Sequence, residues 1–492
     1  MHLTGRIREQ PDQLIHQELL VPQFLFEAEH MLSGYLYAEK VLLLEYERMG
    51  LVSREAASEA AEALSSITKE RLAADAQSNM SDISFAIEQH VHRQMAGSIP
   101  NWHMDRSRND FQACAQIMYA RGELFALVEN MLAFGESLLR KARLYTDMPM
   151  PGYTHYQTAQ VITPAFYLTA MAEQVIGALD RLRQVFDAIN KCPLGSGAMA
   201  GLELAWDRER MAELLGFDGP NRHALVAVAA REWPLRITHE LSLFSVALSR
   251  FVTDLIQWSS SEYNFLLLTD SLAGISSAMP QKRNYPVLER LRGLTGHISA
   301  FSFDILLGHR NTAYSNLVEV SKEATRNIGH MFRQMETLLK LFALVVDHLE
   351  FKPERMLEIC EREYLGGFAL ANQLTLQHDI PYRQAQVIVG QYIVRAIERQ
   401  LPAQTVHVEL LQQVCDDFGM KVVLEEGPFR GMFDPAENLT RKVTNGSTNP
   451  TLVRGLIDQQ QGELTVARDL FAGKADTIKR ALQRVDLRNE EA

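Results

Sequence analysis

The chain has 492 residues, of which 47% are hydrophobic and 22% are charged, and these values exclude a disordered or fibrous protein. Its length favours two to four domains and permits a large buried core. Lys and Arg together number 49 and Asp and Glu together 61, which gives a net charge of −12 without any basic block. Because such a chain is poorly suited to the phosphate backbone, we expect no nucleic-acid partner.

The four cysteines are far apart in the sequence, with neither zinc-type spacing nor the density of a disulfide framework. The first twenty residues carry charges where a signal peptide needs an apolar core. No apolar run reaches the length of about 18 residues that a bilayer-spanning helix requires. These features predict a cytoplasmic protein with no membrane association and no metal site.

Long segments without internal proline show apolar residues at helical spacing. In chain order, residues 111–146 form the first, and Thr163 followed by Pro164 is typical of the start of the next helix. Residues 321–349 show the same period. One stripe steps by three and four through Leu241, Phe244, Leu248, Phe251 and Leu255. The pattern predicts an all-α fold built on an elongated bundle of long helices.

Two changes in the character of the chain suggest domain boundaries. A mixed first segment ends near residue 110, and the last of these long helices ends near residue 360. We therefore expect an N-terminal domain over residues 1–110, the central bundle over 111–360 and a C-terminal domain over 361–492. Both flanking domains are expected to be smaller and mostly helical.

Residues 271–286, SLAGISSAMPQKRNYP, combine two serines, a lysine and an asparagine between two helical segments. Gly, Ser, Asn and Pro are common turn residues, so a solvated interhelical turn would explain part of this composition. A serine beside a cation and amide donors, however, suits a base or nucleophile that acts next to a bound anion.

Two further loops are rich in polar residues. Residues 103–110, HMDRSRND, bring basic side chains and an amide donor together, as a carboxylate site requires, although the aspartates could simply neutralise the arginines. Residues 150–160, MPGYTHYQTAQ, hold a single histidine before a helix, which is more often structural than catalytic when it stands alone.

In the same order along the chain, these loops resemble motifs of the aspartase/fumarase superfamily. Residues 271–286 are similar to G-S-S-x-M-P-x-K-x-N-P in the Pro-Gln-Lys form of the argininosuccinate lyases, residues 103–110 to H-x-G-R-S-R-N-D, and residues 150–160 to M-P-G-Y-T-H-x-Q-x-A-Q. The resemblance spans about residues 78–453. It implies reversible β-elimination of fumarate from an N-substituted aspartate, without a cofactor. It also implies a homotetramer in which three subunits contribute loops to each active site.

The resemblance assigns the elimination chemistry to two of the loops. Ser276 would be the base, with Ser277 as a close competitor. Lys282 and Asn284 would face the carboxylate that becomes a dianionic aci-carboxylate when the neighbouring carbon loses its proton. Thr154 would add a hydroxyl donor.

The remaining assignments concern the histidine and the substrate. His155, paired with Glu289, would position the substrate or help the leaving nitrogen to take up a proton. Arg108 and Asn109, with Ser107 beside them, would bind the succinyl carboxylates. Further matches to substrate-contacting positions are Tyr314, Glu319, Lys322 and Gln160.

Departures from the family pattern collect at positions that would select the amine half of the substrate. A family histidine is replaced by Ser84, a lysine by Asn316 and a glutamine by Glu319. Other departures are Asp105, Ile275 and Tyr285. Three interpretations follow: an argininosuccinate lyase, a lyase for another N-substituted aspartate such as ethylenediaminedisuccinate, or an inactive crystallin-like scaffold. The catalytic residues present together speak against the third.

Overall fold

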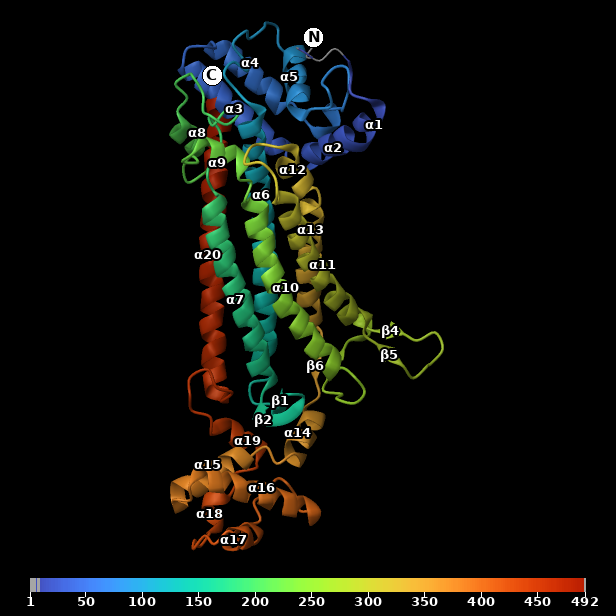
Figure 1. The fold of residues 1–492 in the computed structure, drawn as a ribbon, viewed down its shortest axis with the longest axis vertical. Coiled ribbons are helices and arrows are strands. Elements are labelled where there is room, and N and C mark those ends of the chain that lie inside the picture. The colour runs from blue at the N-terminus through green and yellow to red at the C-terminus, as the bar shows by residue number, and fades with distance from the viewer. Residues whose placement is uncertain (1–5, 7–8, 491–492) are drawn as a thin grey trace.

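The computed structural model describes residue 6 and residues 9–490. Six long helices run along an extended shaft, and smaller helices lie at both of its ends (Figure 1). The shaft helices are α6 (Arg108–Arg143), α7 (Pro164–Ile189), α10 (Trp233–Trp258), α11 (Pro286–His309), α13 (Ile328–Asp347) and α20 (Pro450–Glu490). The predicted all-α bundle with two smaller helical ends is therefore confirmed.

One end of the shaft is covered by the N-terminal segment and by short elements from later in the chain. The N-terminal elements are α1 (Gln13–Ile15), η1 (His16–Leu20), α2 (Val21–His30), α3 (Leu32–Arg48), α4 (Arg54–Ser65), η2 (Lys69–Arg71) and α5 (Ile83–Gln94). The later elements are α8 (Arg208–Leu214), α9 (Ala224–Ala229), α12 (Val318–Ser321) and η4 (Glu323–Thr325).

The other end carries a helical cap with its own apolar core, which includes Tyr364, Tyr392 and Phe433. Its helices are α14 (Pro353–Arg362), α15 (Gly367–His378), α16 (Tyr382–Glu398), α17 (Val408–Asp417), α18 (Glu426–Phe429) and α19 (Pro435–Thr440). Helix α20 then returns along the shaft beside α6 and α7. The boundaries at residues 110 and 360 stay a prediction.

Three two-stranded antiparallel sheets complete the described part of the chain. They pair β1 (Met150–Thr154) with β2 (Gln157–Ile162), β3 (Leu266–Leu268) with β6 (Leu349–Phe351), and β4 (Gly274–Ile275) with β5 (Arg283–Asn284). The short 3-10 turn η3 (Asp270–Leu272) leads into β4. The β4–β5 hairpin projects sideways from the shaft, whereas β1 and β2 lie at its lower end (Figure 1).

Local sequence signals account for several helix ends. The Ser107 side chain accepts a hydrogen bond from the Asn109 N–H and caps α6, and Thr163 caps α7 in the same way before Pro164. All five residues of the predicted α10 stripe are buried. The predicted helix over 321–349 is interrupted, because Lys322 leaves the helical conformation and α13 begins only at Ile328.

Candidate active site

The first group of predicted residues meets where α6 begins. The Arg108 Nη1 atom donates a hydrogen bond to Asp82 Oδ2 at 2.7 Å, and the Asn109 side-chain amide donates to the Ala198 carbonyl at 3.0 Å. Asp82 also caps α5, since its Oδ1 atom accepts the Ser84 N–H at 2.9 Å. Ser84, which replaces the family histidine, therefore lies in the first turn of α5, two residues after the partner of Arg108.

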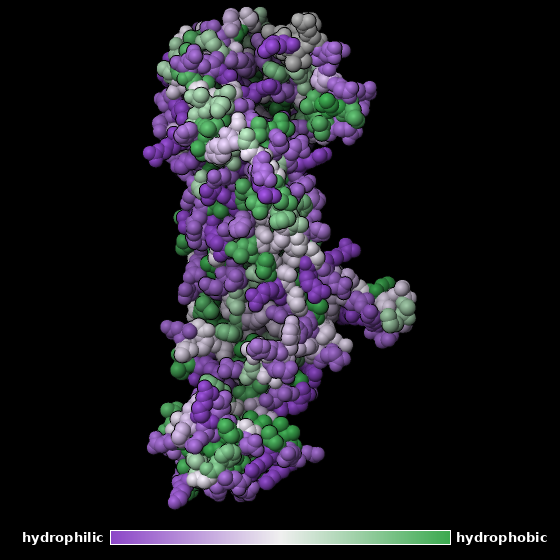
Figure 2. Space-filling view, viewed as in Figure 1, coloured by the Kyte–Doolittle hydropathy of each residue, from purple (hydrophilic) through white to green (hydrophobic). Residues whose placement is uncertain are grey.

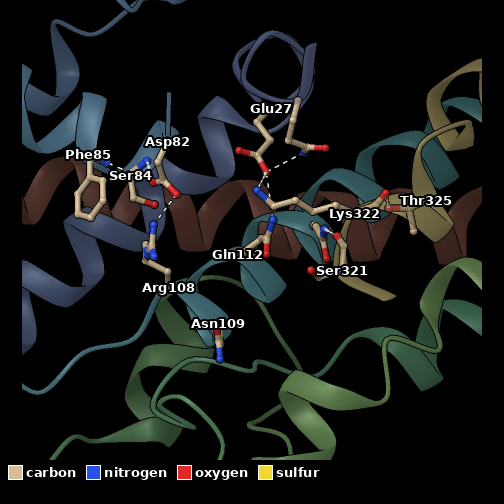
Figure 3. Close-up of polar contacts among 12 residues, drawn as sticks. Glu27, Asp82, Ser84, Phe85, Arg108, Asn109, Gln112, Ser321, Lys322 and Thr325 are labelled. Carbon is tan, nitrogen blue, oxygen red and sulfur yellow. Dashed lines mark hydrogen bonds and ion pairs between the residues drawn. The ribbon is translucent and has the colours of Figure 1, made fainter. Parts of the chain in front are cut away.

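A cavity of about 210 Å³ lies beside this group. Three predicted residues, Arg108, Asn109 and Lys322, line it, whereas Tyr314 and Glu319 lie in the neighbouring exposed segment. The other lining residues are Glu27, Tyr35, Asp82, Ile83, Ser84, Gln112, Asn316, Val318 and Ser321. Figure 3 shows Glu27, Gln112 and Lys322 meeting from α2, α6 and the segment that contains α12, whereas Asn109 points away from them.

Glu27 also lines this cavity, and the loop motifs do not identify it. It lies on α2, is only 3% exposed, and approaches Lys322 Nζ at 3.6 Å. Burial raises the pKa of Glu27, although Lys322, Gln23 and Gln112 act in the opposite direction. No sequence motif marks this residue, and the buried carboxylate is apparent only when α2 is placed against α6.

The Asn316 departure is tied to a buried arginine. The Arg231 Nη2 atom donates to Asn316 Oδ1 at 2.8 Å and to the Asn109 carbonyl at 3.1 Å, while Nη1 donates to Gln116 Oε1 at 2.6 Å. Burial lowers the pKa of Arg231 to about 10. A second cation at position 316 would face this guanidinium, so asparagine is compatible with the local charge.

The loop before α6 is anchored by buried ionic groups. Arg106 forms a bidentate ion pair with Glu39, through contacts of 2.6 and 2.8 Å. Asp105, which stands at the family glycine, has a φ of +55°. Its carboxylate accepts the Leu204 N–H at 2.8 Å and the Trp206 indole N–H at 3.0 Å. Both acidic residues therefore hold the scaffold around Arg108.

Asp110 connects α6 to the 193–201 loop. Its Oδ2 atom accepts the Gly197 N–H at 2.9 Å, and Gly197 has a φ of +64°. A Cβ atom at Gly197 would lie 2.6 Å from the Gly201 carbonyl oxygen, so this approach requires glycine. Burial raises the pKa of Asp110 to about 6 despite hydrogen bonds from the Gly197 and Phe111 amides.

We expect Asp110→Asn to remove a pH dependence of stability. The folded pKa of about 6 exceeds the unfolded value of about 3.9, so ionisation costs the native state stability as pH rises between these values. Relative to the original protein, the variant should gain about 2 kcal/mol of unfolding free energy between pH 4 and pH 7. Thermal or urea unfolding of both proteins across this pH range measures how their unfolding free energies change. If the difference between the two proteins does not change with pH, the raised pKa of Asp110 is contradicted.

The second group lies on the hairpin of β1 and β2. Thr154, His155 and Gln160 are all exposed, and the turn places His155 and Tyr156 at φ values of +53° and +60°. This tight reversal presents the histidine at the outer end of the hairpin.

The third group lies on the projecting β4–β5 hairpin. The Ser276 Oγ atom accepts the Met279 N–H at 3.0 Å and the Ala278 N–H at 3.4 Å. Lys282 is exposed, Asn284 is half-buried in β5, and Glu289 is exposed in the first turn of α11. Two backbone donors on one hydroxyl oxygen favour negative charge at that atom.

Two departures from the family pattern, Ile275 and Tyr285, lie in or next to this hairpin. Ile275 is 94% exposed, opposite Arg283 in the strand register, so it presents an apolar side chain outwards. Tyr285 stands immediately before α11, with the Arg283 guanidinium 5.7 Å from its ring centre. With both departures present, Ser276 accepts hydrogen bonds from its two backbone donors.

One chain does not bring the three groups together. Helix α6, with 36 residues, is about 54 Å long, and Arg108 lies at the opposite end from the β1–β2 hairpin. The β4–β5 hairpin points away from both (Figure 1). Within the described part of the chain, no hydrogen bond or ion pair joins His155, in the turn between β1 and β2, to Glu289, in the first turn of α11.

No group of three or more His, Cys, Asp or Glu side chains among the described residues is arranged to hold a metal ion. None of the helices in the described ranges has the length and apolar character that crossing a bilayer requires.

Comparison with known proteins places the chain in a family. A family model described as "Lyase" matches residues 26–299, more than half of the chain. Argininosuccinate lyase 1 of Shouchella clausii is 29% identical over 489 residues, covering 98% of this chain and 97% of that protein. Argininosuccinate lyase of Thermoanaerobacter sp. strain X514 is 32% identical over 357 residues, covering 72% of this chain and 77% of that protein.

Solved structures agree. An EDDS lyase in complex with formate superposes with a TM-score of 0.83 at 25% identity, covering 96% of this chain and 95% of that chain. A class II fumarase from Schistosoma mansoni shares the fold, with a TM-score of 0.68 at 16% identity, covering 87% of this chain and 92% of that chain.

The fold and these likenesses define a carbon–nitrogen lyase. The chain belongs to the aspartase/fumarase superfamily, and within it to the argininosuccinate lyase-like members, as the three loop motifs predicted.

Proposed function

We propose that this enzyme catalyses the reversible β-elimination of fumarate from an N-substituted aspartate. The observation that carries the proposal is the environment of Ser276, whose Oγ atom accepts two backbone N–H groups inside the loop that also contains Lys282. Such donors lower the cost of an alkoxide, the form in which serine can act as a base. Ser277 has no comparable pair of donors among the described contacts, which favours Ser276.

In the proposed reaction the Ser276 alkoxide removes a proton from the substrate carbon next to the β-carboxylate. The electron pair is held as a dianionic aci-carboxylate, stabilised by Lys282, Asn284 and the Thr154 hydroxyl. Collapse of this intermediate forms the carbon–carbon double bond and breaks the carbon–nitrogen bond. The nitrogen leaves with the bonding pair and takes up a proton, and His155, with Glu289, assists that transfer or positions the substrate.

The separation of the three groups in one chain supports an active site shared between subunits of a homotetramer. Arg108, Asn109 and Ser107 would bind the succinyl carboxylates, while hairpins from other copies would supply the reacting groups. Exposed apolar residues on the shaft offer contact surface between copies (Figure 2), among them Leu243, Val246, Phe303, Leu306 and Leu307. Tyr314, Glu319, Lys322 and Gln160 would complete the substrate contacts.

Two substrates are candidates, and they differ in the amine half. Likeness to argininosuccinate lyases over nearly the whole chain favours argininosuccinate, and likeness to EDDS lyase favours ethylenediaminedisuccinate. The departures at Ser84, Asn316 and Glu319 also favour a substrate whose amine half is not arginine.

The deciding experiment follows fumarate release by ultraviolet absorbance from argininosuccinate, ethylenediaminedisuccinate and simpler N-substituted aspartates. Release from argininosuccinate would identify an arginine-forming enzyme. Release only from another compound would show that the departed positions have rebuilt the amine pocket. No release from any compound by an intact oligomer would contradict the proposal and favour an inactive scaffold.

A further inference from the structure

The hairpin that carries Ser276 has little structure of its own. Its strands, β4 and β5, pair over only two positions, and the hairpin projects from the shaft (Figure 1). Between the strands, Ser276 is half-buried and residues 277–282 are exposed. Because an isolated two-stranded hairpin is marginally stable in water, contacts outside the strand pairing have to fix where Ser276 stands.

Arg283, in β5, ties this hairpin to the shaft. Its Nη2 atom lies 3.0 Å from Asp270 Oδ1 and donates a hydrogen bond to the Leu268 carbonyl. The guanidinium also lies 5.7 Å from the centre of the Tyr285 ring, within the range of a cation–π contact. One side chain therefore contacts three segments at the base of the hairpin, namely the end of β3, η3 and the residue before α11.

The contact with Leu268 is the strongest of the three. Leu268 is 1% exposed, and β3 pairs with β6, so that both strands contribute buried residues to the main core. The side chain of Asp270 is instead 95% exposed, so water screens its ion pair with Arg283. A hydrogen bond from a charged donor to the carbonyl of a core strand is stronger. Arg283 therefore joins the hairpin to the packed part of the molecule mainly through this carbonyl.

The base of the hairpin is confined at β4 as well. A Cβ atom at Gly274 would lie 2.8 Å from Pro286 Cγ, so the start of β4 lies tightly against the start of α11. The two strands therefore leave the shaft from fixed points, one set by this close approach and the other by Arg283.

We propose that Arg283 is a positioning residue of the elimination, which fastens the hairpin to β3 and so fixes where Ser276 and Lys282 stand. The proposal rests on the proposed function and assigns a further residue to it. The superfamily motif leaves the position between Lys282 and Asn284 open, so the motif does not mark Arg283. Without this attachment the hairpin would sample orientations in which Ser276 is misplaced, and a displacement of about 1 Å costs about 100-fold in rate.

Steady-state fumarate release by the full-length oligomer tests this role, with argininosuccinate or ethylenediaminedisuccinate, whichever the original enzyme cleaves. Arg283→Gln should lower kcat by about 10- to 100-fold and change KM by about threefold or less, because the hairpin supplies the reacting groups. Arg283→Lys keeps a charged donor and should recover most of this loss. Arg395→Gln is the matched control: it removes a partly exposed ion pair with Asp417 in the C-terminal cap, and kcat should stay unchanged.

Variants of Asp270 separate the ion pair from the carbonyl contact. Asp270→Asn should lower kcat by about threefold or less, since exposed ion pairs contribute little. The double variant Arg283→Gln/Asp270→Asn should be no slower than Arg283→Gln alone, because the second change removes an interaction that is already lost. Losses that multiply, or a larger loss in Asp270→Asn than in Arg283→Gln, would overturn the proposal.

Proteolysis measures the attachment without any substrate. A lysine-specific endoprotease cuts after Lys282, which is exposed in the hairpin, and yields fragments 1–282 and 283–492. Because residue 283 follows the cut bond, each rate is divided by that of a synthetic peptide with the hairpin sequence of the same variant. Arg283→Gln should be cut about 5- to 20-fold faster than the original protein, since cleavage follows local opening, and Arg395→Gln at the original rate.

Thermal unfolding reports whether each variant is folded. An unchanged kcat in folded Arg283→Gln, a loss confined to KM, or equal cutting rates would each overturn the proposal. If Arg283→Gln does not fold, Asp270→Asn has to be cut faster than the original protein, and an unchanged rate would overturn the proposal. No fumarate release by the original protein would reject the proposed function, whereas faster cutting of Arg283→Gln would still retain Arg283 as the attachment of the hairpin.

Discussion

Ser276→Ala is expected to lower fumarate release by about 100- to 10,000-fold, the range typical of losing a general base. The hydroxyl oxygen is the atom on which the Ala278 and Met279 amides converge, and alanine leaves these donors without an acceptor. Since Ser276 lies on a projecting hairpin outside the bundle core, the thermal unfolding temperature should change little. Initial rates with saturating substrate measure the effect.

Ser277→Ala is the matched control, because it removes a hydroxyl from the adjacent, more exposed position of the same hairpin. We expect it to retain most of the activity. The reverse pattern, with Ser277→Ala inactive and Ser276→Ala active, would assign the base to the second serine. Similar losses in both variants would indicate that the hairpin contributes shape and not a particular base.

Mixing two inactive variants should restore activity if subunits share their active sites. Arg108 and Ser276 lie on separate parts of one chain, so Arg108→Ala and Ser276→Ala would damage different contributions to each site. In a randomly mixed tetramer, about one quarter of the sites would receive both intact contributions. Co-expression should therefore raise the rate from nearly zero to about a quarter of the original.

A second pair of variants provides the control for this experiment. Ser276→Ala and Lys282→Ala alter the same hairpin, so every site in a mixed oligomer would receive one damaged hairpin. Co-expression of that pair should give no recovery. Failure of the Arg108 and Ser276 variants to complement, with mixed oligomers confirmed by tagged purification, would contradict a site shared between subunits.

Much of the fold was predictable because its signals are local. The buried stripe of α10 follows from apolar spacing alone, and the start of α7 follows from Thr163 and Pro164. The break at Lys322 was not predictable from periodicity, since apolar spacing continues past it. At the break, Lys322 pairs with Glu27, a residue far from it in the sequence.

The candidate site was predictable to a different degree in each part. The motifs identified Arg108, Asn109 and Lys322, and the structure brings these three to one cavity. Motifs could not identify Glu27, because a lone glutamate in an apolar helix has no signature until its neighbours are known. The same holds for Arg231, whose partners come from α6 and from the segment before α12.

By itself, the sequence determined the helical bundle and the superfamily, because helical periodicity and loop motifs are properties of neighbouring residues. Its loop motifs also predict the residues suited to elimination. Only the tertiary structure decided that the three loops stand apart in one chain, and that Glu27 and Asp82 flank one cavity. These relations depend on how helices pack across long separations in sequence. Burial and charge at such contacts are set by partners that no local pattern specifies.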